Sequence, residues 1–326
     1  MLYRLHLALP LIIAGSSFAN AQREDSNVPD AVRPAFTLEF EAIDEMSGIV
    51  RSDRFDDVYW VHNDSGDLPR LFAIDGSGKV IVPDFFKDAY HGDVVETNKR
   101  PWTGTIIKGA ENEDWESIEV HNDTLYIADT GNNGYDRRDL GVYMVAEPNP
   151  YGARESQSIK FAPIHYPEQY ENALIGFLLR DTSRDSEAMF MSDGRLYFLT
   201  KSPKPHEVDG KRLGTTLLRL DSLNTNESNE LQPLDEHPNV HLPTGADLSP
   251  DGQHLAVLTY SELWVFRRPL RGDRWLSEGQ AHRLPLPGEQ TGQLEGIAWK
   301  DNDTLLFGNE PGHFFTVELE QIPEDE

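Results

Sequence analysis

The stretch that decides the fold is Asp114–Asn133, which reads DWESIEVHNDTLYIADTGNN. A turn signal, His121-Asn122-Asp123, separates two runs of apolar residues, and the second run begins at Leu125-Tyr126-Ile127. Runs of β-branched and aromatic residues that are bounded by turn formers predict a pair of strands. A polar segment of Asp, Thr, Gly and Asn then follows at the point where the second strand would end.

The same arrangement recurs five times along the chain. The recurring pattern starts at Ser47-Gly48-Ile49, Glu116-Ser117-Ile118, Glu187-Ala188-Met189, Thr244-Gly245-Ala246 and Glu295-Gly296-Ile297. A turn signal and a second apolar run follow each time, and most units show a third run, such as Leu71–Ile74 or Leu263–Phe266. Repeats of several short strands at this spacing are typical of a β-propeller.

The sequence therefore predicts an all-β fold, a single β-propeller over residues 35–326. Five four-stranded blades fit the repeats best, and six is the alternative, because the two longest intervals between repeats could hold a degenerate unit. We interpret the extra residues there as loops around Pro83–Trp102 and Glu168–Arg184. The last unit has room for three strands, so an N-terminal strand at Phe36–Glu41 is expected to complete it and remove the exposed edge. An array of β-sandwiches is the rival, but it would not place acids at the same point of each unit.

The N-terminus resembles an export signal. Residues 1–21 combine Arg4 and His6, an apolar run from Leu7 to Gly15, and the small-residue site Ala19-Asn20-Ala21. The apolar run is too short to span a bilayer. We predict a signal peptide at 1–21, a flexible leader at 22–34, and a periplasmic or extracellular protein without a membrane span. A closed propeller has no edge that needs a partner, so a monomer is expected.

Composition narrows the range of partners. The chain has 56 acidic and 29 basic residues, a formal net charge of −27, which disfavours nucleic acid as a ligand. It has no cysteine, which excludes disulfides, thiolate zinc sites and cysteine nucleophiles. Solubility, or life in salty water, is the first explanation of the acidic excess, which also suits a protein that holds cations.

The recurring pattern is expected on the innermost strand of each blade. Its first members would then form a ring around the channel: Ser47, Glu116, Glu187, Thr244 and Glu295. Two residues earlier stand Glu45, Asp114, Asp185, Leu242 and Gln293. Crowded carboxylates repel one another, so protons or a cation must neutralise them, and oxygen ligands favour Ca²⁺ or Mg²⁺. Alternatively, these acids bind the backbone of neighbouring blades or form a proton-sharing pair.

A second ring of polar residues is expected where the second strands end. Its members are Asn63, Asp129, Thr200, Thr259 and Asn309, each followed by Asp64, Thr130, Lys201, Tyr260 or Glu310. Loops at one end of a propeller share one mouth, so these side chains would line it, unless they serve only as turn residues. His62 is a candidate base in this region, with a packed, hydrogen-bonded histidine as the alternative.

Several motifs resemble a known group of proteins. Trp60–Gly66, Asp114–Ile118, Ala128–Asn133, Asp185–Met189 and Thr244–Ser249 resemble uncharacterised bacterial secreted β-propeller proteins. That resemblance implies the fold and export but no activity. More distantly, Leu294–Trp299 is similar to the Glu-Gly-containing inner strands of gluconolactonase and phytase-like propellers. This second resemblance implies a channel-bound calcium or other divalent ion, hydrolysis of lactones or phosphoesters, and Glu295, Asn63, Asp129 and Asn309 as ligands.

Two functional hypotheses follow. In the first, the protein is a hydrolase of a small ester, lactone or phosphoester that depends on a divalent cation, with Ca²⁺ expected first. The expected ligands are Glu116, Glu187, Glu295, Asp129, Asn63 and Asn309. His62 or Asp64 would accept a proton, Lys201 would stabilise negative charge, and Thr200, Thr259, Tyr260 and Glu310 would contact the substrate. In the second, a non-catalytic propeller binds a glycan, a peptide or a cell-envelope partner at its mouth.

Overall fold

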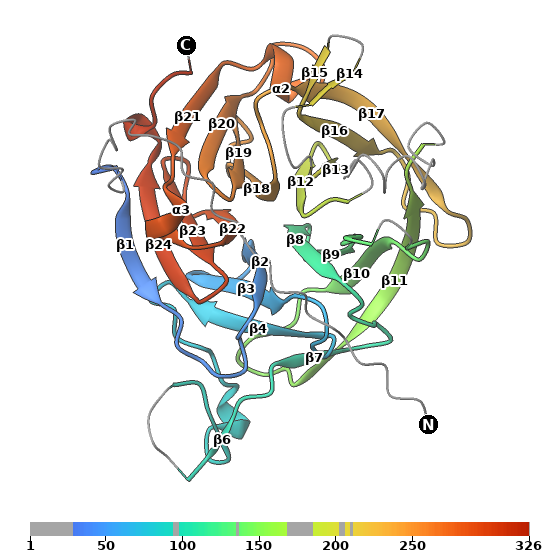
Figure 1. Cartoon of the computed structure of the whole chain (residues 1–326). Helices are drawn as coiled ribbons and strands as arrows, with labels where there is room; N and C mark the ends of the chain where they lie inside the picture. Colours follow the sequence, from blue (N-terminus) through green and yellow to red (C-terminus); the bar gives the residue numbers. More distant parts are fainter. Residues whose placement is uncertain are drawn as a thin grey trace, which may run out of the picture.

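The computed structural model describes residues 29–93, 98–134, 137–167, 185–201, 206–208 and 211–325. In these residues nearly all regular structure is strand, and the sheets stand around a central axis (Figure 1). The predicted all-β propeller is confirmed. The proposed signal peptide and most of the leader lie outside the described residues. Within the described part, no helix is long and apolar enough to cross a membrane.

Five innermost strands surround the channel. They are β2 (Met46–Arg51), β8 (Trp115–His121), β12 (Ala188–Ser192), β18 (Pro243–Leu248) and β22 (Leu294–Trp299). β2 contacts β8 and β22, and β18 contacts β12 and β22. Because β8 also contacts β12, the five strands close a ring around the axis.

Each inner strand begins an antiparallel unit. The second strands are β3 (Val58–Asn63), β9 (Thr124–Asp129), β13 (Arg195–Leu199), β19 (His254–Thr259) and β23 (Thr304–Asn309). The third strands are β4 (Arg70–Asp75), β10 (Gly141–Ala146), β16 (Thr215–Leu220), β20 (Glu262–Arg267) and β24 (His313–Glu318). The outer strands are β7 (Thr105–Lys108), β11 (Glu155–His165), β17 (Asn229–His237), β21 (Ala281–Pro285) and β1 (Arg33–Thr37).

The described residues thus contain five four-stranded units. Whether the whole chain has five or six blades stays a prediction, because Glu168–Arg184, one of the two stretches considered for a sixth unit, lies outside the described residues. The turns predicted between the first and second strands are present. At the β8–β9 turn, for example, Asn122 and Asp123 have φ of 50° and 58°, the left-handed conformation that such two-residue turns require.

An N-terminal strand closes the ring, as predicted, but it lies earlier than predicted. β1 pairs antiparallel with β24 and covers Arg33–Thr37, so it also takes two residues from the predicted leader. Phe36 stacks on Phe314 with ring centroids 4.6 Å apart. Leu38 and Phe40 lie beyond the strand and are buried between the first and last units, so the alternation of Phe36, Leu38 and Phe40 reflects core packing as well as strand pairing.

The core is divided among the interfaces between neighbouring units. One apolar cluster joins the first and last units through Ile49, Tyr59, Leu306 and Phe314. Four further clusters join the other neighbouring pairs in the same way. Burial of a large apolar side chain contributes about 1.5–3 kcal/mol, so each interface stabilises the closed ring.

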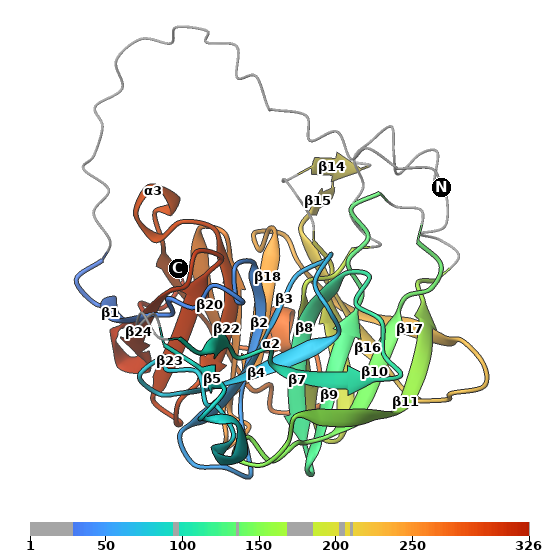
Figure 2. The same ribbon diagram turned by 90° about the horizontal axis from the view of Figure 1, so that it is seen from below.

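Short elements lie outside the five sheets. They are η1 (Asp84–Phe86), β5 (Tyr90–His91), β6 (Arg100–Pro101), β14 (His206–Val208), β15 (Lys211–Leu213), α2 (Trp275–Glu278), α3 (Gly288–Thr291) and η3 (Leu319–Gln321). The Pro83–Trp102 region, predicted as a loop, carries η1, β5 and β6 and projects from the outer rim (Figure 1). In the edge-on view, α3 and the β14–β15 hairpin rise at one end of the channel (Figure 2).

The closing interface can be tested with a pair of phenylalanines. Phe40 is 5% exposed inside it, whereas Phe85 is 89% exposed on η1. We expect Phe40→Ala to lower the free energy of unfolding by roughly 3–5 kcal/mol because it leaves a cavity. Phe85→Ala should change it by less than about 0.5 kcal/mol. Urea unfolding would measure both, and equal effects would contradict this account of ring closure.

Candidate functional site

A β-bulge marks the start of four inner strands. The register shifts between Met46 and Gly48 in β2, and equivalent shifts occur in β8, β18 and β22. The extra residue is always the first member of the recurring pattern: Ser47, Glu116, Thr244 or Glu295. In the fifth unit, Glu187 directly precedes β12. Bulges redirect side chains, and here they turn the pattern's first member toward the axis.

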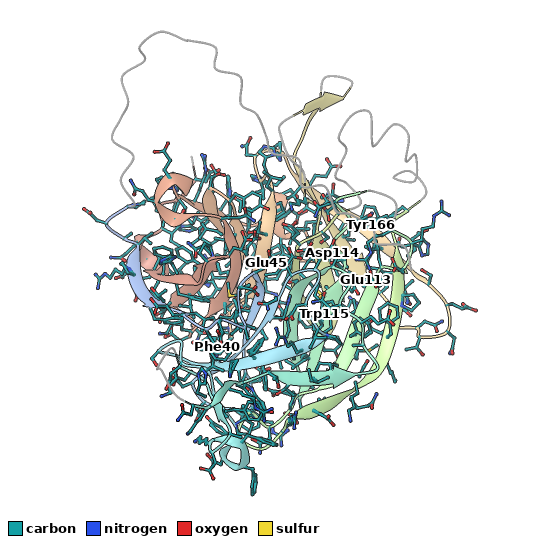
Figure 3. The ribbon with its side chains drawn as sticks, turned by 60° about the horizontal axis from the view of Figure 1, so that its bottom comes forward. Phe40, Glu45, Glu113, Asp114, Trp115 and Tyr166 are labelled. Carbon is teal, nitrogen blue, oxygen red and sulfur yellow. The ribbon has the colours of Figure 1, made fainter. Side chains whose placement is uncertain are left out.

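The side chains meet in a pocket of about 160 Å³ at this end of the channel, called here the mouth. It is lined by Glu45, Met46, Ser47, Asp64, Glu116, Asn133, Glu187, Lys201, Tyr260, Gln293, Glu295 and Glu310. Figure 3 shows Glu45 and Asp114 on the side of their units that faces the axis. Seven predicted site residues are therefore brought together. Beneath them, the glycines of the pattern narrow the channel to a space of only about 10 Å³.

The second predicted ring divides into two sets. Asp64, Lys201, Tyr260 and Glu310 line the mouth. The fifth member of that set, Thr130, is buried, and its hydroxyl donates to the Ser186 carbonyl oxygen at 2.8 Å. The residues one position earlier do not appear among the lining residues and are all buried: Asn63, Asp129, Thr200, Thr259 and Asn309. Successive side chains of a strand point to opposite faces, so two consecutive residues cannot both reach the axis.

The buried set makes local structural contacts instead. The Asn63 amide donates to the Ala42 carbonyl oxygen at 3.0 Å, and the Asn309 amide donates to the Thr291 carbonyl oxygen at 2.6 Å. Thr200 and Thr259 accept hydrogen bonds from backbone N–H groups through their hydroxyl oxygens. The structure thus places Asn63, Asn309, Thr200 and Thr259 in turn and strand-end contacts, away from the predicted ligand and substrate positions.

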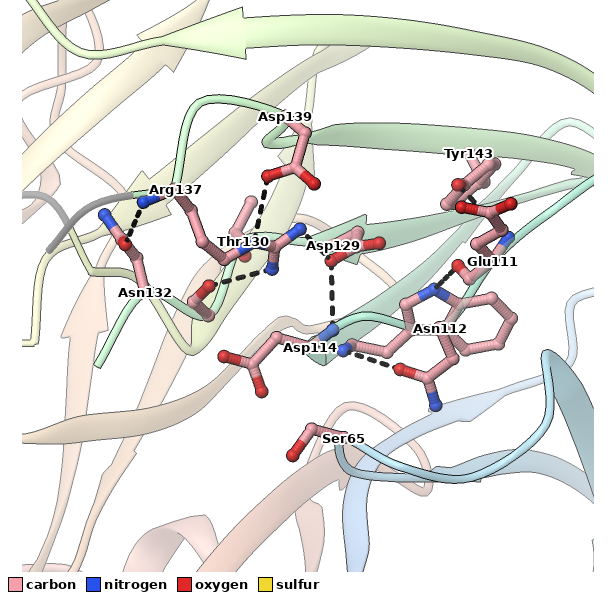
Figure 4. Close-up of polar contacts among 12 residues, drawn as sticks. Ser65, Glu111, Asn112, Asp114, Asp129, Thr130, Asn132, Arg137, Asp139 and Tyr143 are labelled. Atoms are coloured by element: carbon pink, nitrogen blue, oxygen red, sulfur yellow. Dashed lines mark hydrogen bonds and ion pairs between the residues drawn. The ribbon is translucent and has the colours of Figure 1, made fainter. Parts of the chain in front are cut away.

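Asp129 lies one layer behind the mouth. Its Oδ1 accepts the Asp114 N–H at 3.1 Å and lies 2.8 Å from Nη2 of Arg137. Arg137 also donates to the Gly131 carbonyl oxygen at 2.9 Å (Figure 4). Burial raises the pKa of Asp129 although Arg137 opposes the shift. Its position supports the backbone that carries Asp114.

His62 does not line the mouth, where the role of base was suggested for it. Its side chain is fully buried and lies edge-on to Trp115, with ring centroids 5.8 Å apart. Nδ1 lies 3.0 Å from the Asn63 carbonyl oxygen, and burial lowers the pKa to about 4. A Cβ on Gly48 would come within 2.2 Å of Nε2, so this glycine is required by the packed imidazole. The packed-histidine alternative is therefore the one that the structure matches.

Three carboxylates form the tightest acidic group at the mouth. One oxygen each from Asp64, Asp114 and Glu116 lies within 4.8 Å of the other two. Burial, and then the nearby Asp64, raise the pKa of Asp114 to about 7. Burial, then Asp64 and Asp114, hold the pKa of Glu116 well above its usual range. Asp114 was expected near the axis but not among the ligands.

Asn112, which the sequence did not single out, joins the two loops that carry this group. Its Nδ2 donates to the Asp64 carbonyl oxygen at 3.0 Å, and its Oδ1 accepts the Trp115 N–H at 3.1 Å. Figure 4 shows Asn112 beside Asp114 and above the loop that contains Ser65. The sequence does not reveal that the Asp64 loop and the segment before β8 lie side by side, so nothing in it indicates that Asn112 joins them.

Lys201 is the one basic side chain among the described residues that line the mouth. It forms an ion pair with Glu187, and its Nζ lies 5.6 Å from the centre of the Tyr260 ring. The second carboxylate oxygen of Glu187 and Oδ2 of Asp185 are buried and have no hydrogen-bond partner in the described structure. The mouth therefore holds more negative charge than Lys201 offsets.

The raised pKa values predict an unusual pH dependence of stability. Burial raises the pKa of Glu295 to about 7, from an ordinary 4.5. A carboxyl group whose pKa is raised by folding stabilises the protein below its ordinary pKa, and this contribution is lost as pH rises through about 7. With chelator present, we expect the melting temperature to fall between pH 5 and pH 8, and less steeply in Glu295→Gln. If the melting temperature of Glu295→Gln fell with pH as steeply as that of the wild-type chain, the raised pKa of Glu295 would be contradicted.

The Glu187–Lys201 pair can be examined by a double-mutant cycle. Their side chains are only 6% and 11% exposed, so removal of one partner leaves a buried charge. We expect Lys201→Met to lower the free energy of unfolding by roughly 3–5 kcal/mol. Lys201→Met combined with Glu187→Gln should recover much of this loss. Additive effects of the two changes, measured by urea unfolding at pH 7, would show that the pair is not coupled.

Comparisons with known proteins give only distant likenesses. No protein-family model matches the chain, and no curated protein is significantly similar to it in sequence. Among solved structures, the allergen Mala s 1 of Malassezia sympodialis has a TM-score of 0.45 at 10% identity, covering 89% of this chain and 95% of its own. The PQQ-bound aldose sugar dehydrogenase of Streptomyces coelicolor has a TM-score of 0.44 at 12% identity, covering 88% and 98%. A candidate gluconolactonase has a TM-score of 0.41 at 12% identity, covering 82% and 72%. The assignment as a β-propeller rests on the arrangement of the sheets described above.

Proposed function

We propose that the mouth of the channel binds one divalent cation, with Ca²⁺ as the best-fitting ion, and that the protein is a hydrolase of a small ester, lactone or phosphoester. The observation that carries this proposal is the Asp64–Asp114–Glu116 group, whose oxygens converge within 4.8 Å. In keeping with the N-terminal sequence, we also propose that the protein is exported and acts in the periplasm or outside the cell.

The donor set suits a hard cation. Every candidate ligand atom in the group is a carboxylate oxygen, which Ca²⁺ and Mg²⁺ prefer over nitrogen or sulfur. Further carboxylates of Glu45, Glu295 and Glu310 face the same pocket, against the single basic residue Lys201. Burial, and then repulsion from neighbouring carboxylates, raise the pKa values of Asp114 and Glu116, and a bound cation would offset that repulsion.

The reaction follows from the remaining residues of the mouth. A bound divalent cation polarises a carbonyl or phosphoryl oxygen and lowers the pKa of a bound water. Glu295 would accept the proton from that water, because a pKa of about 7 suits a base at neutral pH. This role replaces the one suggested for His62. Tyr260 and Glu310 would contact the substrate, and the pocket of about 160 Å³ restricts it to a small molecule.

A non-catalytic binding role is the second candidate. It is favoured by the combination of Tyr260 with several carboxylates in the lining of the mouth. Carboxylates accept hydrogen bonds from sugar hydroxyls and an aromatic ring covers an apolar sugar face, so the same pocket would also suit the end of a glycan. Lys201, engaged by Glu187, would then serve only to neutralise that acid.

The cation is tested by elemental analysis of the purified protein and by calcium titration of the chelated form. We expect one divalent ion per chain and a melting temperature that falls on chelation. Asp114→Asn should weaken calcium binding at least about tenfold. Asp84→Asn, which removes a carboxylate that is 72% exposed on η1, is the matched control and should leave the affinity unchanged. No bound ion, together with no effect of chelator, would overturn the proposal.

The hydrolase is tested separately, with calcium-loaded protein on a panel of small esters, lactones and phosphoesters. We expect turnover that Glu295→Gln lowers by about 10²–10⁴-fold while the ion stays bound. Calcium binding without turnover on any of these substrates would reject the hydrolase and leave the binding role. Saturable binding of short oligosaccharides at the mouth would then be the measurement that supports the second candidate.

A further inference from the structure

The opposite end of the channel holds a second pocket, of about 290 Å³. It is built where the inner strands end, and its lining includes Arg51, Asp53, Glu119, Met191, Asp247 and Trp299. None of these residues lines the mouth, and the narrow section at Gly48, Gly245 and Gly296 lies between the two. The pocket is therefore separate from the site proposed above.

Glu119 is the unusual residue of this pocket. Its side chain belongs to the lining, yet the residue is only 5% exposed. Among the described residues, no side chain donates a hydrogen bond to its carboxylate or forms an ion pair with it. Apart from the adjacent Val120 N–H, the groups that act on it are the acids Asp247 and Asp53, and burial holds its pKa well above its usual range. Glu119 is a buried acid that faces a cavity without an opposing charge.

The other charges of the pocket already have partners. Arg268 binds Asp193 at 2.5 Å, and Asp251 accepts a hydrogen bond from the Ser249 hydroxyl at 2.7 Å. Asp247 accepts the Trp299 N–H at 2.7 Å. Burial raises the pKa of Asp247 to about 7 and also raises the pKa of Asp53, and Arg51 opposes both shifts. Arg268 is engaged by Asp193, which leaves Arg51 as the one permanently charged cation beside Glu119, Asp53 and Asp247 among the described residues of the lining, with the titratable His121 near Asp53. A positively charged ligand would supply the charge that Glu119 lacks.

The lining favours an organic cation over a metal ion. In the part of the chain that the structure describes, the one group of three ligating side chains close enough to share an ion is Asp64–Asp114–Glu116, at the mouth. The second pocket instead adds the apolar surfaces of Met191, Leu248 and Pro250 to its acids. We propose that this pocket binds a primary ammonium group on a short alkyl chain, with Glu119 as the main charge partner and the apolar wall against the alkyl carbons.

The experiment uses the full mature chain with one equivalent of calcium, so that the mouth does not compete for the probe. n-Butylammonium is titrated calorimetrically, and n-butanol serves as the neutral probe of similar shape. We expect saturable binding of butylammonium but not of butanol. Glu119→Gln should weaken it at least about tenfold, the factor that corresponds to 1.4 kcal/mol. Glu295→Gln, at the mouth, should leave it unchanged.

A second variant, at an exposed position, keeps the proposal testable if Glu119→Gln does not fold. Asp53 is exposed at the edge of the pocket, and Asp53→Asn should weaken butylammonium binding several-fold while the melting temperature stays the same. Three results would overturn the proposal: no saturable binding to the wild-type chain, equal binding to Glu119→Gln, or displacement of butylammonium by a second equivalent of calcium. The last result would assign the pocket to an inorganic cation.

Discussion

All five inner strands begin at the same end of the channel, and the residue at each bulge therefore faces one common axis. Glutamate occupies two of the four bulges, at Glu116 and Glu295, and Glu187 holds the equivalent place before β12. The fold thus brings together acids that are far apart in sequence, and their repulsion must be offset. Serine 47, at another bulge, contributes by donating to the Glu116 carboxylate at 3.3 Å. Lys201 neutralises one acid, and the raised pKa values of Glu116 and Glu295 favour their protonated forms.

The surrounding structure keeps these acids in place against that repulsion. Asn112 fixes the Asp64 loop to the start of β8, and Asp129 with Arg137 fixes the backbone of Asp114. None of these three side chains lines the mouth. Asp129 and Arg137 belong to the β8–β11 unit, and Asn112 lies at the border between that unit and the first unit. Groups that orient ligands from behind are a usual requirement of metal sites, since ligands must converge before the ion binds. The three carboxylates of Asp64, Asp114 and Glu116 are therefore kept close together by hydrogen bonds of the residues behind them.

The strands and turns could be predicted because each repeats the same local pattern, and five repeats reinforce one another. The convergence of Glu116, Glu187 and Glu295 also followed from the repeat. Two features could not be predicted. Counting back by two from Ser47, Glu116 and Glu295 gives Glu45, Asp114 and Gln293, which do reach the mouth. Counting forward fails, because the bulge adds one residue to the strand: Ile118 packs in the core, and Glu119 lines the channel instead. The choice between Asn63 and Asp64, or between Asn309 and Glu310, depends on where pairing ends, and sequence alone leaves that uncertain by one residue. His62 illustrates the consequence, since its neighbour Asp64 faces the mouth while His62 packs against Trp115.

The two ends of the channel differ in a way that follows from the strand geometry. At the start of the inner strands, the bulges turn side chains inward and draw the carboxylates within metal-sharing distance. At their ends the described pairs show no register shift, and Glu119, Asp247 and Asp53 lie around a larger cavity with apolar surface between them. The same excess of negative charge thus produces two environments: a small one lined by oxygen atoms, and a larger one that mixes carboxylates with Met191 and Pro250. Because the channel narrows to a space of about 10 Å³ at Gly48, Gly245 and Gly296, the two pockets are separate and have different linings.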